Sequence, residues 1–318
     1  MFSLSHKAKQ YSLVALKVLI LVGTFYYIYF KLNTTDVSIK KTVYNAFNLS
    51  IGSLFYFIAL LVMLVFANWL FEILKWKSLI SSFNSISFNR AAKESLASLA
   101  VSLATPNRIG EYGAKALFYP SNNCKKILLL NFIGNGFQML VTTFFGILGL
   151  GYLVIIFEID ISIYKALLLF FTTIIIGLVS YFFRKKEFII KGFTIANIYT
   201  FYKKISARIK IKTLVFSLIR YLVFSFMFFE LLRFFDVQVE LIDGFAAIFG
   251  MYLVSSFLPS IFILDVAIKG GVAVFVFSLL GVPEISVLCT VFIMWLLNMV
   301  LPAIIGSIFL FTLKNQKA

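Results

Sequence analysis

Charged residues are scarce in this chain. Asp, Glu, Lys and Arg make up only 13% of its 318 residues, whereas 61% are hydrophobic. Soluble globular proteins average about 25% charged and roughly 45–50% apolar residues. An apolar excess of this size cannot be buried in one water-soluble core, so lipid must solvate much of it. We therefore expect an integral membrane protein with no room for a sizeable soluble domain.

Histidine and cysteine are also scarce, which limits the chemistry that the chain could perform. The only histidine is His6, and the two cysteines, Cys124 and Cys289, lie far apart in the sequence. Metal sites built from His and Cys clusters are therefore not expected, and neither are His-based catalytic triads or a structural disulfide. The G-x-x-x-x-G-K-[ST] phosphate-binding loop does not occur. We predict no cofactor and no metal.

Long apolar runs are what the sequence has in abundance. A membrane-spanning helix needs about 20 mostly apolar residues, and these runs lack the two-residue alternation of barrel strands. Because a backbone in lipid must satisfy its own hydrogen bonds, the runs predict helices. The strongest runs are Leu13–Phe30, Ile51–Phe71, Ile127–Phe157, Ile163–Phe183, Leu214–Phe235, Ile242–Leu280 and Ile285–Leu313, and a weaker one covers Ser95–Tyr119.

The distribution of lysine and arginine predicts the orientation. The segment 184–212 carries nine basic residues and one acid, Glu187, and is expected to be cytoplasmic, whereas the acidic loops around Glu158 and Glu240 are expected outside. Both termini are then cytoplasmic, in the plasma or inner membrane of the cell. Helical spacing within 184–212 predicts an amphipathic surface helix, the alternative being a solvated connector. The net charge of +16 reflects this topology and attraction to anionic lipid, so we expect no nucleic-acid partner.

Two of the runs are broken and are expected to return to the side that they entered. The run 95–119 is interrupted at Pro106 and Gly110 between cytoplasmic loops, and the run 242–280 at Pro259 between outside loops. The predicted fold is an all-α polytopic membrane protein with about six full spans and two re-entrant or broken helical hairpins. Residues 1–318 form a single transmembrane domain of inverted halves, about 13–157 and 162–313, as in many secondary transporters.

The run TPNRIGEYGAKAL places Arg108, Glu111 and Lys115 inside an apolar hairpin. Ionisable groups at membrane depth are costly, so they pair or face a cavity. We expect a helix to start just after Pro106 with Thr105 as its cap, so that its free amides and Arg108 form an anion site. Glu111 is expected to pair with Lys115, one turn away, leaving the charge of Arg108 for a lipid phosphate. The alternative is that the acid and the lysine only neutralise each other.

The second hairpin repeats this charge pattern, and other spans carry scattered polar groups. Asp265 and Lys269 follow Pro259 with the same spacing of four residues. Within the spans, polar side chains could line a cavity or form hydrogen bonds between helices. The residues concerned are Asn131, Asn135 and Gln138, on one helical face, and Asn298 before Pro302. Arg220 is expected to snorkel toward the headgroups, and Glu230 to pair with Arg233.

The first motif resembles the P-G-R-x-G-E-x-x-R-A-x-x-L signature of the lysylphosphatidylglycerol synthase transmembrane-domain family, also called flippase-like. The run LPSIFILDVAIKGGVAVFVFSLLGV is similar to the second signature of that family. Asn107 replaces a glycine, Lys115 replaces an arginine, and the Gly-Gly-x-Gly loop of the second signature is replaced by 261–263. The resemblance covers about residue 50 to the end and implies lipid translocation. The soluble aminoacyl-transfer domain of larger members is not expected here.

These observations predict a translocase that binds an anionic or zwitterionic lipid headgroup at mid-membrane and moves it between leaflets. The expected substrate-binding residues are Arg108, Glu111, Lys115, Asp265, Lys269, Asn131, Asn135 and Gln138. Two alternatives stay open: a non-transporting accessory membrane subunit, and an enzyme that acts on lipid with Glu111 or Asp265 as its acid or base. The expected partners are membrane lipid and the bilayer, and a protein partner is not identified.

Overall fold

A computed structural model describes residues 50–103, 105, 108–158, 194–258 and 264–316. Within these ranges every regular element is a helix, as the composition predicts. Four helical segments are long and apolar enough to cross a membrane: Ile51–Ile80, Ser121–Ile156, Ala207–Phe234 and Glu284–Leu310. The chain is therefore a helical membrane protein. The spans expected at Leu13–Phe30 and Ile163–Phe183 lie outside the described residues.

The helices follow the apolar runs closely. The first part of the described chain contains α3 (Ile51–Ile80), α4 (Phe88–Ser102), α5 (Gly110–Ala116), the 3-10 turn η2 (Ser121–Asn123) and α6 (Cys124–Ile156). The second part contains α8 (Ile195–Lys204), α9 (Ala207–Phe234), α10 (Leu241–Phe257), α11 (Leu264–Ser278), α12 (Glu284–Trp295), the π-helical turn η3 (Leu296–Val300) and α13 (Leu301–Gln316). Of the segment 184–212, residues 194–212 are described and contain α8 and the start of α9, whereas its position on the membrane surface stays a prediction.

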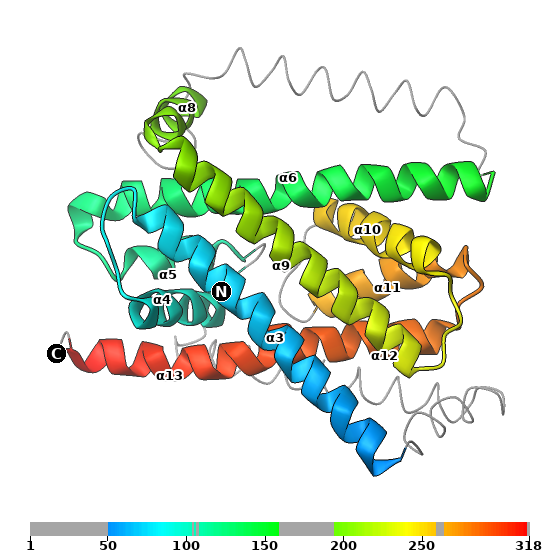
Figure 1. Ribbon diagram of the computed structural model, residues 1–318. Helices are drawn as coiled ribbons and strands as arrows, with labels where there is room; N and C mark the ends of the chain where they lie inside the picture. The colour runs from blue at the N-terminus through cyan, green and yellow to red at the C-terminus, as the bar shows by residue number, and fades with distance from the viewer. Residues whose placement is uncertain (1–49, 104, 106–107, 159–193, 259–263, 317–318) are drawn as a thin grey trace, which may run out of the picture.

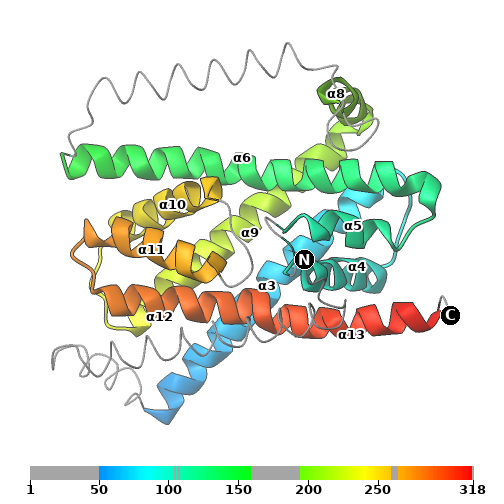
Figure 2. The ribbon, with the colours of Figure 1, turned by 180° about the vertical axis from the view of Figure 1, so that it is seen from behind.

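Both broken runs are helical hairpins. Helices α4 and α5 pack against each other, as do α10 and α11. Figures 1 and 2 show the α4–α5 hairpin near one end of α6 and the α10–α11 hairpin near the other, with their tips directed toward the middle of the molecule. The tips of the two hairpins therefore approach each other from opposite ends.

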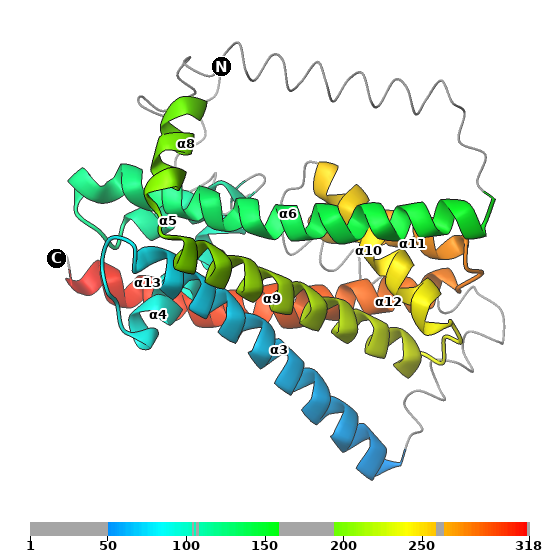
Figure 3. The same cartoon turned by 45° about the horizontal axis from the view of Figure 1, so that its top comes forward.

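The long helices surround these hairpins. Helix α6 packs on α10, α13 packs on α4, and α3 packs along α9. In Figure 3, α3 and α9 run side by side and cross the molecule obliquely, whereas α12 and α13 follow each other along one side. The hairpins thus lie between α6 and the α12–α13 segment.

Close backbone contacts hold the hairpins in place. Gly306 on α13 lies directly against the backbone of Leu96 on α4, so a Cβ at this position would overlap the carbonyl of Leu96. Gly146 and Gly149 on α6 have the same role toward α10, where Leu253 and the carbonyl of Ala246 occupy the space of a side chain. Helix α6 is one continuous helix of 33 residues, so both contacts are made along the same helix.

Candidate functional site

The first hairpin turns differently from the sequence-based prediction. Helix α5 begins at Gly110, not just after Pro106, because Arg108 has a left-handed backbone with φ of 56°. The hydroxyl of Thr105 accepts a hydrogen bond from the amide of Gly110 at 2.7 Å, and the amide of Tyr112 donates to the carbonyl of Ile109 at 3.1 Å. The expected start just after Pro106 is therefore wrong, whereas Thr105 does bond the first amide of the helix, and an anion site at this turn stays a prediction.

Arg108 instead contacts the second half of the chain. Its Nη2 atom lies 3.9 Å from Oδ2 of Asp265 on α11 and 3.0 Å from the sulfur of Met299 on η3. The sequence left Arg108 without an acid partner, and the structure supplies one from 157 residues further along the chain. A separation of 3.9 Å is longer than a hydrogen bond, so this is a loose ion pair.

The second hairpin contributes the other charges at this junction. Asp265 and Lys269 form the expected pair across one turn of α11, with 2.8 Å between Oδ2 and Nζ. Arg108, Asp265 and Lys269 therefore carry two positive charges and one negative charge. The side chains of Arg108 and Lys269 are 36% and 33% exposed, whereas that of Asp265 is 10% exposed. These three residues, hereafter the junction site, hold a net positive charge that remains partly accessible.

Lys115 and Glu111 lie deeper inside the first hairpin. Their expected pair is confirmed, with 2.8 Å between the ammonium and the carboxylate. The ammonium of Lys115 also donates to Asn131 on α6 at 2.7 Å and lies 4.4 Å from the centre of the Trp76 ring on α3. Lys115 is only 2% exposed. Its contacts are all internal, which favours the interpretation that it neutralises Glu111, and a role in binding substrate stays a prediction.

A second carboxylate, Glu94, was not singled out from the sequence. It is fully buried on α4 and accepts hydrogen bonds from the indole of Trp76 at 2.7 Å and the hydroxyl of Tyr119 at 2.8 Å. Arg90, one turn earlier, donates to its other oxygen at 3.0 Å. Burial and the Glu94 carboxylate raise the pKa of Tyr119 well above its ordinary value, so Tyr119 stays a neutral donor. Glu94 thus ties the hairpin to α3.

A further ion cluster corrects the expectation for Arg220. Its Nη1 atom lies 2.9 Å from the carboxylate of Glu72 on α3, which also binds Lys75 at 2.6 Å. Gln138 on α6 accepts a longer hydrogen bond from the same guanidinium at 3.4 Å. Arg220 therefore joins three helices and does not snorkel. The acid and lysine three residues apart in an apolar run, Glu72 and Lys75, were the available signal.

The polar residues of α6 bond to neighbouring helices. Asn131 accepts from Lys115 on α5, and Asn135 donates to the hydroxyl of Tyr112 at 3.1 Å. Gln138 donates to the carbonyl of Ser217 on α9 at 3.4 Å. Of the two interpretations left open by the sequence, the hydrogen bonds support contacts between helices. Asn298 also bonds to a neighbouring helix, because its side-chain oxygen accepts a hydrogen bond from the side-chain amide of Asn68 on α3 at 2.8 Å.

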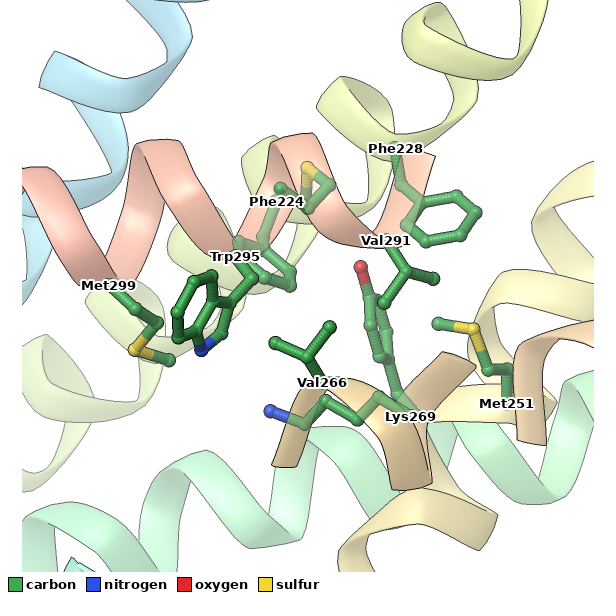
Figure 4. A pocket seen from close by; sticks show the side chains of 10 residues that line it. Phe224, Phe228, Met251, Val266, Lys269, Val291, Trp295 and Met299 are labelled. Atoms are coloured by element: carbon green, nitrogen blue, oxygen red, sulfur yellow. The ribbon is translucent and has the colours of Figure 1, made fainter. Parts of the chain in front are cut away.

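A cavity of about 90 Å³ adjoins the junction site on the side of α11. Its wall comes from α9, α10, α11, α12 and η3 and is aromatic, aliphatic or methionine except for Lys269 and one phenol. The residues that line it are Phe224, Phe228, Met251, Tyr252, Val266, Lys269, Val291, Met294, Trp295 and Met299. Figure 4 shows the Lys269 side chain extending in the direction of Trp295 and Met299.

Met299 links the cavity to the turn of the first hairpin. Met299 lines the cavity and also contacts the guanidinium of Arg108. Pockets that enclose drug-sized ligands measure roughly 300–1,000 Å³. This cavity can therefore take a segment of a larger molecule whose charged part lies at the junction site.

No protein-family model matches the chain, and a search of curated proteins finds no match either. The resemblance to the lysylphosphatidylglycerol synthase transmembrane-domain family thus rests on the two motifs. The residues that carry it include Arg108 and Glu111 in the first motif and Pro259 in the second. Its implications for substrate and activity remain proposals.

Proposed function

We propose that the protein binds the phosphate of an anionic or zwitterionic membrane lipid at the junction site and moves the lipid between leaflets. The observation that carries the proposal is the charge balance at the meeting point of the hairpins. Arg108 and Lys269 share one carboxylate, Asp265, and both cations are about one-third exposed. A lipid phosphodiester carries one negative charge and would bring the sum of these four groups to zero.

The geometry of Arg108 suits a phosphate. A guanidinium stays charged at any accessible pH and presents a planar fork that binds two phosphate oxygens at once. Among the described residues, its guanidinium contacts Asp265 at 3.9 Å and the weakly accepting sulfur of Met299 at 3.0 Å. Unbalanced charge inside a membrane is costly, so binding of a phosphate here would be favoured by electrostatics as well as by hydrogen bonds.

Translocation is supported by the arrangement of the hairpins. They extend from opposite ends of α6, and the Arg108–Asp265 contact joins their tips. We propose that they belong to inverted halves, about 13–157 and 162–313, within a bundle of about six spans whose termini are cytoplasmic. Transporters with such halves bind substrate near the midplane at broken helices. A phosphate that competes with Asp265 for Arg108 would loosen the contact between the halves.

A non-transporting accessory subunit is the second candidate. The interactions of Glu72, Glu94 and Lys115 favour it, since each of these buried charges has partners within the protein. An enzyme that uses Glu111 or Asp265 as its acid or base has less support. Each of these carboxylates is already paired with a lysine ammonium at 2.8 Å.

Reconstituted lipid-transfer measurements on Arg108 variants test the proposal. We expect Arg108→Lys to fold but lose much of the transfer, because a point charge does not reproduce the bidentate geometry. Arg108→Ala should lose nearly all of it. Arg233→Ala is the matched control, since Arg233 is 64% exposed and pairs only locally with Glu230 at 3.3 Å.

Thermal stability measured on the same samples separates a defect of the site from misfolding. Lipid transfer at the wild-type rate by a well-folded Arg108→Ala protein would exclude the phosphate role of Arg108. The accessory-subunit function would then be the better explanation of the fold.

A further inference from the structure

The cavity beside the junction site contains a phenol that has no hydrogen-bond partner. Tyr252 on α10 supplies the only side-chain oxygen among the ten residues that line the cavity. That oxygen is buried and bonds to no group in the part of the chain that the structure describes. Leaving a buried donor unsatisfied costs roughly 1–3 kcal/mol, so a group that binds in the cavity and accepts this proton would gain affinity.

The ring of Tyr252 is fixed by its neighbours. Its centroid lies 5.4 Å from that of Phe224, 6.2 Å from that of Phe228 and 6.0 Å from that of Tyr221. Two of these rings, those of Phe224 and Phe228, also line the cavity. Aromatic contacts of this kind stabilise one orientation. These contacts therefore restrict how far the ring can turn within the described part of the chain.

The surroundings restrict the acceptor to an uncharged group. Apart from Lys269, the cavity wall carries no charge, and a second anion would meet aromatic and methionine side chains. Lys269 belongs to both the cavity and the junction site, so an acceptor in the cavity can belong to the same molecule as the group that neutralises Lys269 and Arg108. In an ester-linked phospholipid, the acyl carbonyl oxygens are uncharged and are joined to the phosphate through the glycerol backbone. The acyl chains that follow them are apolar and match the cavity wall.

We infer that Tyr252 donates its hydroxyl to an acyl ester carbonyl of the lipid, and that the cavity selects ester-linked over ether-linked lipids. The inference rests on the proposed function, since it places the phosphate of the same molecule at Arg108 and Lys269. An ether linkage removes the carbonyl, which is the stronger acceptor, while it keeps the phosphate and the chains. The hydroxyl is then buried without a good partner.

The experiment measures lipid affinity of the full-length protein in detergent by native mass spectrometry. The probes are dioleoyl-phosphatidylglycerol and dioleoyl-phosphatidylethanolamine, each compared with its dialkyl ether analogue. One net hydrogen bond corresponds to about a fivefold change in affinity, so wild-type protein should prefer the ester by about that factor for at least one headgroup. The variant Tyr252→Phe should bind ester and ether equally.

Tyr221→Phe is the matched control. Its hydroxyl is also buried and lacks a partner among the described residues, but Tyr221 does not line the cavity. The ester preference should survive this substitution. Equal binding of ester and ether by wild-type protein, for both headgroups, would overturn the inference and indicate that Tyr252 only contacts trapped water. An ester preference that persists in Tyr252→Phe would overturn it as well.

Arg108→Ala distinguishes this inference from the proposed function. It should weaken ester and ether lipids by the same factor and leave their ratio unchanged. If Arg108→Ala binds both lipids as well as wild type does, the phosphate role of Arg108 is wrong, while the ratio still reports on Tyr252. Absence of measurable binding of all four lipids to wild-type protein would contradict both proposals.

Discussion

Replacement of Lys115 by methionine is expected to destabilise the protein strongly. The ammonium has three internal contacts, with Glu111 at 2.8 Å, Asn131 at 2.7 Å and the Trp76 ring at 4.4 Å, and the residue is 2% exposed. Breaking a buried ion pair by removing one partner costs about 3–5 kcal/mol. The side chain of Glu111 is 18% exposed, so water can partly compensate its charge. We therefore expect a loss near the lower limit, about 3 kcal/mol.

A double variant isolates the interaction. In Lys115→Met with Glu111→Gln, no uncompensated carboxylate remains, so the free energy of unfolding should fall by less than in Lys115→Met alone. Unfolding in mixed detergent micelles, followed by circular dichroism, measures both values. Arg233→Met provides the control for an exposed pair, where the change should stay below about 1 kcal/mol.

The result that would refute this reasoning is additivity. If the double variant loses as much stability as the two single variants together, Lys115 and Glu111 do not interact in the folded protein. A single Lys115→Met variant as stable as wild type would refute it too, because it would mean that water reaches Glu111 freely.

Two further predictions concern packing and orientation. Gly306→Ala should lower the free energy of unfolding by about 1–3 kcal/mol, because the added Cβ would overlap the backbone of Leu96. Gly136→Ala is the control and should be neutral or mildly stabilising, because open space surrounds that position. For orientation, we expect a cysteine at Lys204 to react with a membrane-impermeant reagent only from the cytoplasmic side and one at Glu240 only from outside. Labelling of the Lys204→Cys protein from outside intact cells would contradict the proposed topology.

Contacts within one helix could be predicted from the sequence. The pairs Glu111–Lys115 and Asp265–Lys269 follow from helical spacing alone, because residues four apart share one face. The sequence predicts where the first hairpin is broken, but it does not predict the backbone conformation at the break. The left-handed backbone at Arg108 delays α5 to Gly110, and propensities do not anticipate such a conformation in an arginine.

Contacts between distant segments could not be predicted in this way. The pairing of Arg220 with Glu72 depends on how α9 crosses α3, and no periodicity in either run encodes that crossing. The position of Arg220 within its own helix predicts snorkelling, but it carries no information about a partner on α3. The same holds for Glu94, whose partners come from α3 and from the segment after α5. In both cases, the polar residue was visible in the sequence and its partner was not.

The contact between the two hairpin tips could be predicted in part. Helices α4 and α11 each have 15 residues and are therefore about 22 Å long at 1.5 Å per residue. The hydrocarbon core of a bilayer is about 30 Å thick. On the proposed topology, in which the two hairpins enter from opposite sides along the membrane normal, each would pass the midplane and the tips would overlap in depth. The charges of Arg108 and Asp265 at these tips would then meet at mid-membrane, and a ligand that competes for either charge would act on both hairpins at once.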